Sequence, residues 1–337
     1  MSKAQDDPGI VAVDSLFRDL MVDKEWSTRR DRGFTWWGYR LAQHVAASPR
    51  FQGPDGATAS RLNVWTDLVS DVEDHVAALR LCSVVNMQQT MSALVYDAER
   101  RTMSESFTAV LYADTVRGWA KVMATVAVIQ NTAAHSRCQS LAEVVGGRPN
   151  STDHPGSGQR PEMDDMLNTP EQVIVPAGAG PSAFGGPLVE RLDAMEMPLW
   201  TVHTGSSSGF TVEVEYSSDV PAAMAIAQGV PAGTALVQVS TEEGHPEFGS
   251  GALVLLKLPV TYDDEGEALE AANQLNCLET AGESGVPMMG AWCSEPDNDG
   301  LAFVSFVPSL LARPGVLENF VIYDTLRAKW AYSVLES

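Results

Sequence analysis

The sequence has no run of about 18 uninterrupted apolar residues, the length that a membrane-spanning helix requires. Its first residues, MSKAQDDPG, include acids and a proline where a secretory signal needs basic and then apolar residues. We therefore expect a cytoplasmic protein without a membrane partner. Cysteines are few and widely spaced, which predicts buried thiols rather than a disulfide framework. They are Cys82, Cys138, Cys277 and Cys293.

Basic residues are scarce, since 22 Lys and Arg stand against 44 Asp and Glu, for a formal net charge of −22. Residues 1–150 hold 16 basic and 17 acidic side chains, for a formal net charge of −1. Residues 151–337 hold 6 and 27, for a formal net charge of −21. Because clustered cations are needed to bind a phosphate backbone, a nucleic-acid partner is not expected. The acidic second half indicates either solubility alone or selection of a basic polypeptide partner.

Motifs that carry chemistry are also scarce. No G-x-x-x-x-G-K-[ST] loop is present, and His135 and Cys138 lie three residues apart without a second close pair to complete a metal site. The GSSSG segment matches the G-x-S-x-G elbow of serine hydrolases, with Ser207 as the nucleophile. That elbow leads from a strand into a helix, but FTVEVEY follows here with the alternation of a strand. No catalytic residue, cofactor or metal is therefore predicted.

What the sequence does contain is a repeated order of elements, from about Val11 to Val145 and again from Pro187 to Ser337. Each half runs helix, strands, helix, hairpin, helix. The prediction is an α+β fold of two tandem domains, each an antiparallel sheet flanked by helices in the order α-βββ-α-ββ-α. The domains are residues 1–146 and the acidic residues 187–337.

The closing hairpins and helices give the clearest sign of the repeat. SALVYD and TMSESFTAVLY flank a turn at Glu99 to Arg101, and the second half has its turn at Asp297 to Gly300. Helices with a 3.6-residue apolar period follow both hairpins. Their apolar stripes are Val116, Trp119, Met123 and Val126 in the first half, and Val316, Phe320, Tyr323 and Trp330 in the second.

Residues 147–186 separate the halves and are rich in Gly, Pro and Ser, as in GGRPNSTDHPGSGQRP and PAGAGPSAFGGP. So few apolar groups offer little to offset chain entropy, which predicts an extended, mobile linker. The stretch from Gln172 to Val175 could add a short edge strand.

Aromatic side chains gather in FTWWGY. On a strand Phe34 and Trp36 face one way, while Trp37 and Tyr39 face the other, so both faces carry bulky rings. One face must cover the core. The other is either a docking surface, because Trp and Tyr anchor interfaces, or is covered by the linker or the second domain. With Trp65 expected beside this cluster, the candidates for partner binding are Trp36, Trp37, Tyr39 and Trp65.

Both halves resemble the type III secretion chaperone-like fold, including the YbjN-like group. The resemblance rests on VWTDLVSDVEDHVAALRLCSVVN leading into SALVYD, on LKLPVTYDDEGEALEAANQLN leading into GAWCSE, and on Asn86 and Asn276 at equivalent helix ends. It implies small, acidic α+β domains that bind other polypeptides and have no catalytic residues. Two copies in one chain imply an internal pseudo-dimer and leave a homo-oligomer open.

The preferred hypothesis is therefore a non-enzymatic protein, polypeptide-binding in the manner of a chaperone or regulatory, which uses its sheet and groove surfaces. A serine hydrolase acting through Ser207 is the alternative from another class. A pair of purely structural domains within a larger assembly is the third hypothesis.

Overall fold

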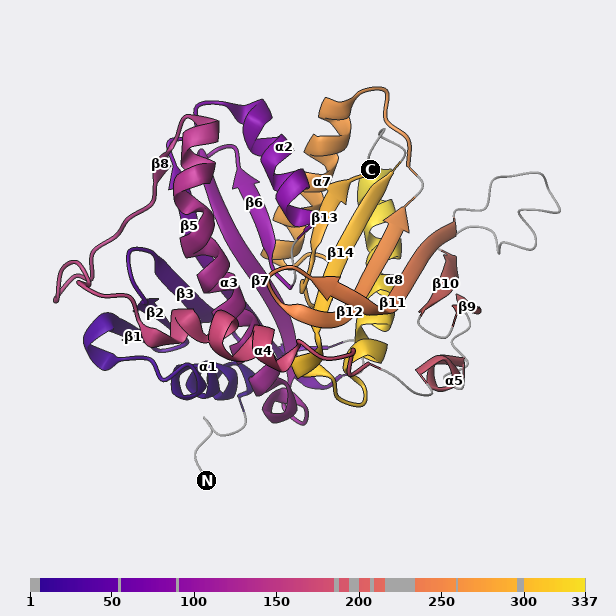
Figure 1. Ribbon diagram of the computed structural model, residues 1–337, viewed down its shortest axis with the longest axis horizontal. Helices are drawn as coiled ribbons and strands as arrows, with labels where there is room; N and C mark the ends of the chain where they lie inside the picture. Colours follow the sequence, from indigo (N-terminus) through magenta and orange to yellow (C-terminus); the bar gives the residue numbers. More distant parts are fainter. Residues whose placement is uncertain are drawn as a thin grey trace. The chain divides into compact units, whose positions relative to one another are not determined.

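The computed structural model shows an α+β protein with two open antiparallel sheets, which confirms the predicted fold class (Figure 1). It describes residues 7–53, 56–88, 91–184, 188–193, 200–206, 209–215, 234–258, 260–295 and 300–336. The chain forms two compact units. Unit 1 comprises Met1–Cys82, Met91–Gln172 and Cys277–Met289, and unit 2 comprises Ser83–Thr90, Val173–Asn276 and Gly290–Ser337.

The elements of the first half begin with a helix and four antiparallel strands before the middle helix. They are α1 (Pro8–Asp19), the 3-10 helix η2 (Lys24–Trp26), β1 (Ser27–Arg30), β2 (Gly33–Trp37), β3 (Ala42–Ala47), β4 (Phe51–Gln52), β5 (Thr58–Ser70), α2 (His75–Asn86), β6 (Ala93–Asp97), β7 (Thr102–Tyr112), α3 (Val116–Val145) and β8 (Arg148–Pro149).

Three short helical segments follow in the region predicted as a linker: the 3-10 helix η3 (Asp165–Asn168), the π-helix Pro170–Ile174 and α4 (Val175–Ala177). The stretch from Gln172 to Val175 is therefore helical, not a strand. The remaining elements are α5 (Leu188–Asp193), β9 (Trp200–Ser206), β10 (Gly209–Glu215), β11 (Thr234–His245), β12 (Gly249–Leu258), α7 (Glu265–Ala281), β13 (Ala291–Ser294), β14 (Leu301–Pro308), the 3-10 helix η6 (Ser309–Leu311) and α8 (Val316–Leu335).

The two sheets have the same strand order. Sheet 1 runs β1-β2-β3-β5-β7-β6, with β4 and β8 also pairing with β5, and sheet 2 runs β9-β10-β11-β12-β14-β13. Apart from β4 and β8, each strand of sheet 1 thus has a counterpart at the same position and in the same chain order in sheet 2. Among the described residues the order is α-ββββ-α-ββ-α plus short accessory strands, so one more strand precedes each middle helix than the sequence indicated.

Both middle helices are capped in the same way. The carboxylate of Asp74 accepts a hydrogen bond from the amide of Ala77 at 2.9 Å, and that of Asp264 accepts one from Glu267 at 3.0 Å. An acid at this position satisfies an N–H group that the first helical turn leaves without a partner. The acidic runs at these helix starts therefore have a structural explanation.

Sheet 1 is covered on both faces. Helices α1 and α3 pack against each other and against β5, whose side chains Leu62 and Val64 are fully buried (Figure 1). Residues of Cys277–Met289 in unit 1 cover the opposite face. There the Arg61 guanidinium donates to the carbonyl oxygens of Ala281 and Gly282 at 3.1 and 2.5 Å. The sheet therefore offers its edges, more than its faces, for further contact.

In sheet 2, helix α8 packs against β10, β11 and β12. The strand side chains Val212, Val237 and Val254 are fully buried. Alternate residues of β10, namely Thr211 and Glu213, point the other way and are half-buried or exposed. No helix in the described ranges is long and apolar enough to cross a bilayer.

Candidate binding surfaces

The structure buries the two tryptophans of β2. Trp36 has no exposed surface and Trp37 is 7% exposed. Tyr39 follows the end of β2, is half-buried, and lies under the Arg40 guanidinium at 4.7 Å from its ring centroid. Trp65 on β5 is half-buried and stacks on His44 of β3 with centroids 4.9 Å apart. The four predicted partner-binding residues thus lie on three neighbouring parts of unit 1 rather than on one open patch.

A chain segment covers Trp37, and we call it the strap (residues 151–163). The indole Nε1 of Trp37 donates to the Thr152 hydroxyl at 3.2 Å, and the Trp37 ring meets that of His154 edge-on at 4.9 Å. The Arg160 guanidinium donates to the Trp37 carbonyl oxygen at 2.9 Å. The first part of the predicted linker is therefore held against unit 1 by hydrogen bonds to β2.

The strap is anchored at both ends. On one side β8 pairs with β5, and the Asn150 amide donates to the Leu68 carbonyl oxygen at 2.7 Å. On the other, the Asp164 amide donates to the carbonyl oxygen of Gly38 at 2.8 Å, and Leu167 is 3% exposed. Between these anchors none of the residues 151–163 is buried.

A cavity of about 350 Å³ lies beside the strap in unit 1. Trp26 and the Arg160 guanidinium form part of its wall, with the guanidinium carbon 5.6 Å from the Trp26 ring centroid. Arg160 also pairs with the Asp164 carboxylate at 2.9 Å. Two further acids line the cavity, Glu162 and Asp165. An aromatic face together with carboxylates favours a cation.

Sequence reasoning missed the open edge of sheet 2. Within the described residues β9 pairs with β10 alone and ends the strand order of the sheet. The segment WTVHTGS that forms it has no Asp, Glu, Lys or Arg, and Thr201 and His203 are exposed. A seven-residue strand without formal charge is the sequence signal that could have identified this edge.

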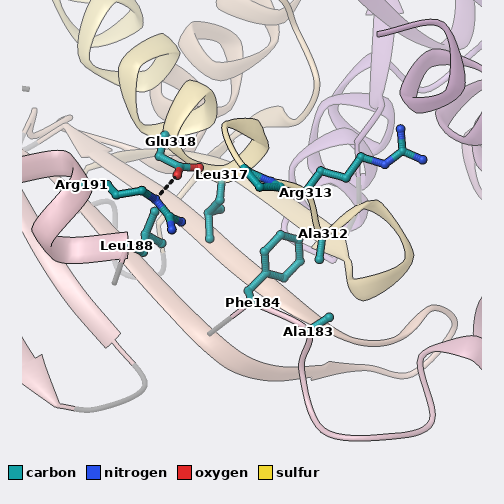
Figure 2. Close-up of a pocket in the computed structure, with 9 residues that line it drawn as sticks. Ala183, Phe184, Leu188, Arg191, Ala312, Arg313, Leu317 and Glu318 are labelled. Carbon is teal, nitrogen blue, oxygen red and sulfur yellow. Dashed lines mark hydrogen bonds and ion pairs between the residues drawn. The ribbon is translucent and has the colours of Figure 1, made fainter. Parts of the chain in front are cut away.

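Figure 2 shows a smaller pocket of about 170 Å³ in unit 2, between the segment that precedes α5 and the start of α8. Phe184, Leu188 and Leu317 form its apolar wall. The Arg191 guanidinium donates to Glu318 at 2.6 Å, and the other carboxylate oxygen of Glu318 accepts from the Gly315 amide at 3.0 Å. These polar groups satisfy one another, which indicates a structural link between α5 and α8.

A wider groove of about 740 Å³ lies over the hairpin of β11 and β12. The GAGPS segment crosses this hairpin, since the Ser250 amide donates to the carbonyl oxygen of Gly178 at 2.6 Å. Glu242 and Glu243 line the groove and are exposed. His245 closes one end, with its Nε2 at 2.8 Å from the Gln88 carbonyl oxygen. The groove is acidic, as is the second half as a whole.

All four cysteines are free thiols; Cys82 and Cys293 are buried, as predicted, whereas Cys138 and Cys277 are half-buried. Burial raises the pKa of Cys277 to about 11 and that of Cys293 to about 12, with smaller contributions from Asp97 and Glu295 respectively. Burial likewise raises the pKa of the Cys82 thiol. Since the thiolate is the reactive form, these side chains are not suited to nucleophilic chemistry.

The other side chains considered as metal ligands or catalytic residues do not form a site in the described ranges. These ranges contain no cluster of three or more His, Cys, Asp or Glu side chains placed to hold a metal ion. His135 donates or accepts within unit 1 only, at the Asn131 carbonyl oxygen and the Leu41 amide. Ser207, the nucleophile of the hydrolase alternative, lies outside the described residues.

Comparison of the chain with protein-family models, with curated proteins and with solved structures finds no match in any of the three.

Proposed function

We propose that this protein is a non-enzymatic, polypeptide-binding protein, and that it takes a basic, extended segment as an additional strand on β9. The single observation that carries the proposal is the uncharged edge of sheet 2, which no other strand of the described residues pairs with and which lies next to the acidic side chain of Glu213. The sequence already predicts a polypeptide-binding protein. The edge of sheet 2 adds where the polypeptide would bind, on β9, and how, as an additional strand.

The edge of sheet 2 differs from the equivalent edge of sheet 1. β1 has four residues, two of which are Arg29 and Arg30, both exposed. Short, charged edge strands resist pairing with another chain. β9 has seven residues and none with a formal charge. Strand addition supplies main-chain hydrogen bonds, so an edge of this length can hold a peptide without a deep pocket.

The charge next to β9 favours a basic partner. Glu213 on β10 lies opposite Thr201 in the register and is exposed. Its carboxylate is 3.3 Å from the Nε2 of His203 on β9. Electrostatic complementarity contributes most to partner choice and to the association rate, and it weakens with salt. The formal net charge of −21 over residues 151–337 acts in the same direction.

The test is a binding titration with two labelled peptides of equal length, one alternating Lys and Val and the other alternating Glu and Val. We expect the Lys peptide to bind and the Glu peptide to bind at least about tenfold more weakly. Thr201→Lys should weaken the Lys peptide about tenfold, because a lysine on an edge strand opposes pairing and repels the ligand. Thr28→Lys, on the equivalent strand β1, is the matched control and should leave binding unchanged.

Equal binding of both peptides, or equal loss in Thr28→Lys and Thr201→Lys, would contradict the proposal. The mass of the unliganded protein in solution gives a second check. A dimer that Thr201→Lys dissociates would mean that a second copy of the chain occupies this edge instead of a basic partner.

A further inference from the structure

We infer that the strap (residues 151–163) is an internal occupant of a second polypeptide-binding surface, and that an arginine-bearing segment of a partner displaces it. This surface lies in unit 1 and does not depend on the β9 edge. It consists of the Trp37 ring and main chain, the Trp26 ring and the Asp164 carboxylate.

The strap is held in the way that a bound peptide is held. Its contacts go mainly to backbone groups: the Thr152 amide donates to the Arg40 carbonyl oxygen at 3.0 Å, and the Ser157 hydroxyl donates to that of Glu25 at 3.0 Å. Arg160 donates to the Trp37 carbonyl oxygen. The strap turns back at residues 154–158, where His154 and Gly158 exchange backbone hydrogen bonds. Such contacts can be made by another segment that has this turn and places a guanidinium at the same point.

The strap also has little to keep it in place. No residue of 151–163 is buried, and the segment is rich in Gly, Pro and Ser. Segments with few buried apolar contacts open locally at much lower free energy than the core does. Release would expose Trp37, whereas Asn150 and Asp164 would keep the two ends attached through their bonds to Leu68 and Gly38. The strap can therefore leave without unfolding the sheet.

The chemistry of the site selects an arginine. Arg160 places its planar guanidinium near the face of Trp26 and bonds to Asp164 and to the Trp37 carbonyl oxygen. A planar donor fork suits this combination of ring, carboxylate and carbonyl better than a lysine ammonium does. The neighbouring cavity of about 350 Å³, lined also by Glu162 and Asp165, leaves room for an incoming cation.

The experiment replaces residues 151–163 of the full chain with a Gly/Ser segment of equal length and adds a labelled peptide of residues 150–161. We expect the peptide to bind this variant at least about tenfold more tightly than it binds the wild type, where the strap competes at high effective concentration. The same peptide with Arg160→Ala should bind at least about tenfold more weakly. Arg148→Ala, an exposed side chain outside the strap that pairs with Asp71, is the control and should behave as wild type.

Hydrogen exchange in the wild-type protein tests the same inference without any replacement. The amides of Thr152 and Asp164 should exchange at different rates: Thr152 at least about a hundredfold faster than the amides of β5, and Asp164 more slowly than Thr152. Peptide binding that is equal with and without the arginine, absence of binding to the replaced variant, or a Thr152 amide that exchanges only with global unfolding would each overturn it. None of these outcomes bears on β9, so the two proposals fail separately.

Discussion

In each unit a row of paired residues crosses the centre of the sheet at equivalent positions. The row includes polar side chains in unit 1 and only apolar ones in unit 2. In sheet 1 the row runs through Trp36, Gln43, Thr66, Glu105 and Leu94, and in sheet 2 through Val212, Val237, Leu256, Phe303 and Trp292. All ten side chains are at most 1% exposed. The first row includes an amide, a hydroxyl and a carboxyl, while the second is entirely apolar. The strand order alone therefore does not require polar groups at this place.

The two units therefore hold a helix over a sheet of the same strand order in two different ways. In unit 1 the Gln43 amide donates to Gln130 and to the Ala127 carbonyl oxygen, each at 2.7 Å, and Gln130 donates to the Glu105 carbonyl oxygen at 2.7 Å. These directional bonds fix the rotation of α3. In unit 2 the Arg327 guanidinium of α8 lies 3.7 Å from the Phe303 ring centroid, so stacking and shape have that role.

The largest expected effect is in unit 2. Arg327 is 1% exposed and pairs with Asp324, which is fully buried. Arg327→Leu should cost about 3–5 kcal/mol of unfolding free energy, because it removes the cation from a buried carboxylate. Urea unfolding followed by circular dichroism measures this.

Two variants of α8 control this result. Combining Arg327→Leu with Asp324→Asn should recover part of the loss, since the buried negative charge is then gone. Leu326→Ala, at a neighbouring residue that is 46% exposed, should change stability by only about 0.5 kcal/mol. If Arg327→Leu lowers the unfolding free energy no more than Leu326→Ala does, the Arg327–Asp324 pair does not stabilise unit 2.

The second prediction exchanges the chemistry of the two rows. Gln43→Val, which places the side chain of Val237 at the equivalent position of unit 1, should cost about 2 kcal/mol because Gln130 and the Ala127 carbonyl lose a donor. Adding Gln130→Leu should cost less than the sum of the single changes, since the two amides act as a pair. Additive losses in urea unfolding would contradict the role given to this bond.

The third prediction concerns the start of α1. The Asp7 carboxylate accepts hydrogen bonds from Gly9 and Ile10 and pairs with Arg32 at 2.8 Å. Asp7→Asn should cost about 1–2 kcal/mol at pH 7, because a charge-assisted bond becomes a neutral one. Arg18→Ala, at an exposed pair of the same helix, serves as the control and should cost less.

The same pair gives a dependence on pH. The hydrogen bond from Arg32 is the largest cause that lowers the pKa of Asp7, and burial opposes it. A lowered folded-state pKa means that the stabilisation is fully present above the unfolded-state pKa of about 3.9 and is lost as the pH falls through the folded-state pKa. Unfolding between pH 5 and 2 should therefore be less steep in Asp7→Asn than in the wild type.

The smallest expected effect is a second pH dependence, in unit 1. Burial lowers the pKa of His135, while its bond to the Asn131 carbonyl oxygen opposes this. Its Nε2 accepts from the Leu41 amide at 3.2 Å, so protonation would break that bond. Because the folded-state pKa is lowered, the stabilisation is present above about 6.5 and is lost as the pH falls below it.

The measurement is urea unfolding at pH 7.5, 6.5 and 5.5, with the slope compared between wild type and His135→Gln. We expect a smaller loss on acidification in the variant. His44 has a pKa that burial also lowers, so His44→Gln should reduce the slope too. An unchanged slope in the variant with both replacements would exclude the histidines as its cause.

Much of the order of elements could be predicted from the sequence, because periodicity is a local property. The helices around Leu79 and Leu275, the hairpin at Glu99 to Arg101 and the two closing helices are present. Asn86 and Asn276, predicted to be equivalent, are both buried and both donate to the Trp292 carbonyl oxygen, at 3.3 and 2.9 Å. Their shared partner was not predictable, since it lies far from Asn86 in the sequence.

Other features of the structure could not be predicted from the sequence. Met21 continues the apolar spacing of Val13, Leu16 and Leu20, yet it follows the end of α1 with φ of 49° and is 75% exposed.

The composition of residues 147–186 predicts an extended, mobile linker with few apolar contacts, and in the structure Leu167, Ile174 and Phe184 of this region are buried. The composition does not reveal that residues 151–163 are held against unit 1, because the carbonyl oxygens of Arg40, Glu25 and Trp37 that accept their hydrogen bonds are backbone groups that any sequence has.

The sequence by itself determined the class of fold, the duplication and the uneven charge, because hydrophobic period, turn residues and acid content are readable along the chain. Only the tertiary structure decided which strands are edges, that Trp37 lies beneath a strap, and that one central row is polar and its counterpart apolar. Those outcomes depend on which residues meet across strands, and register brings together positions that are distant in the chain.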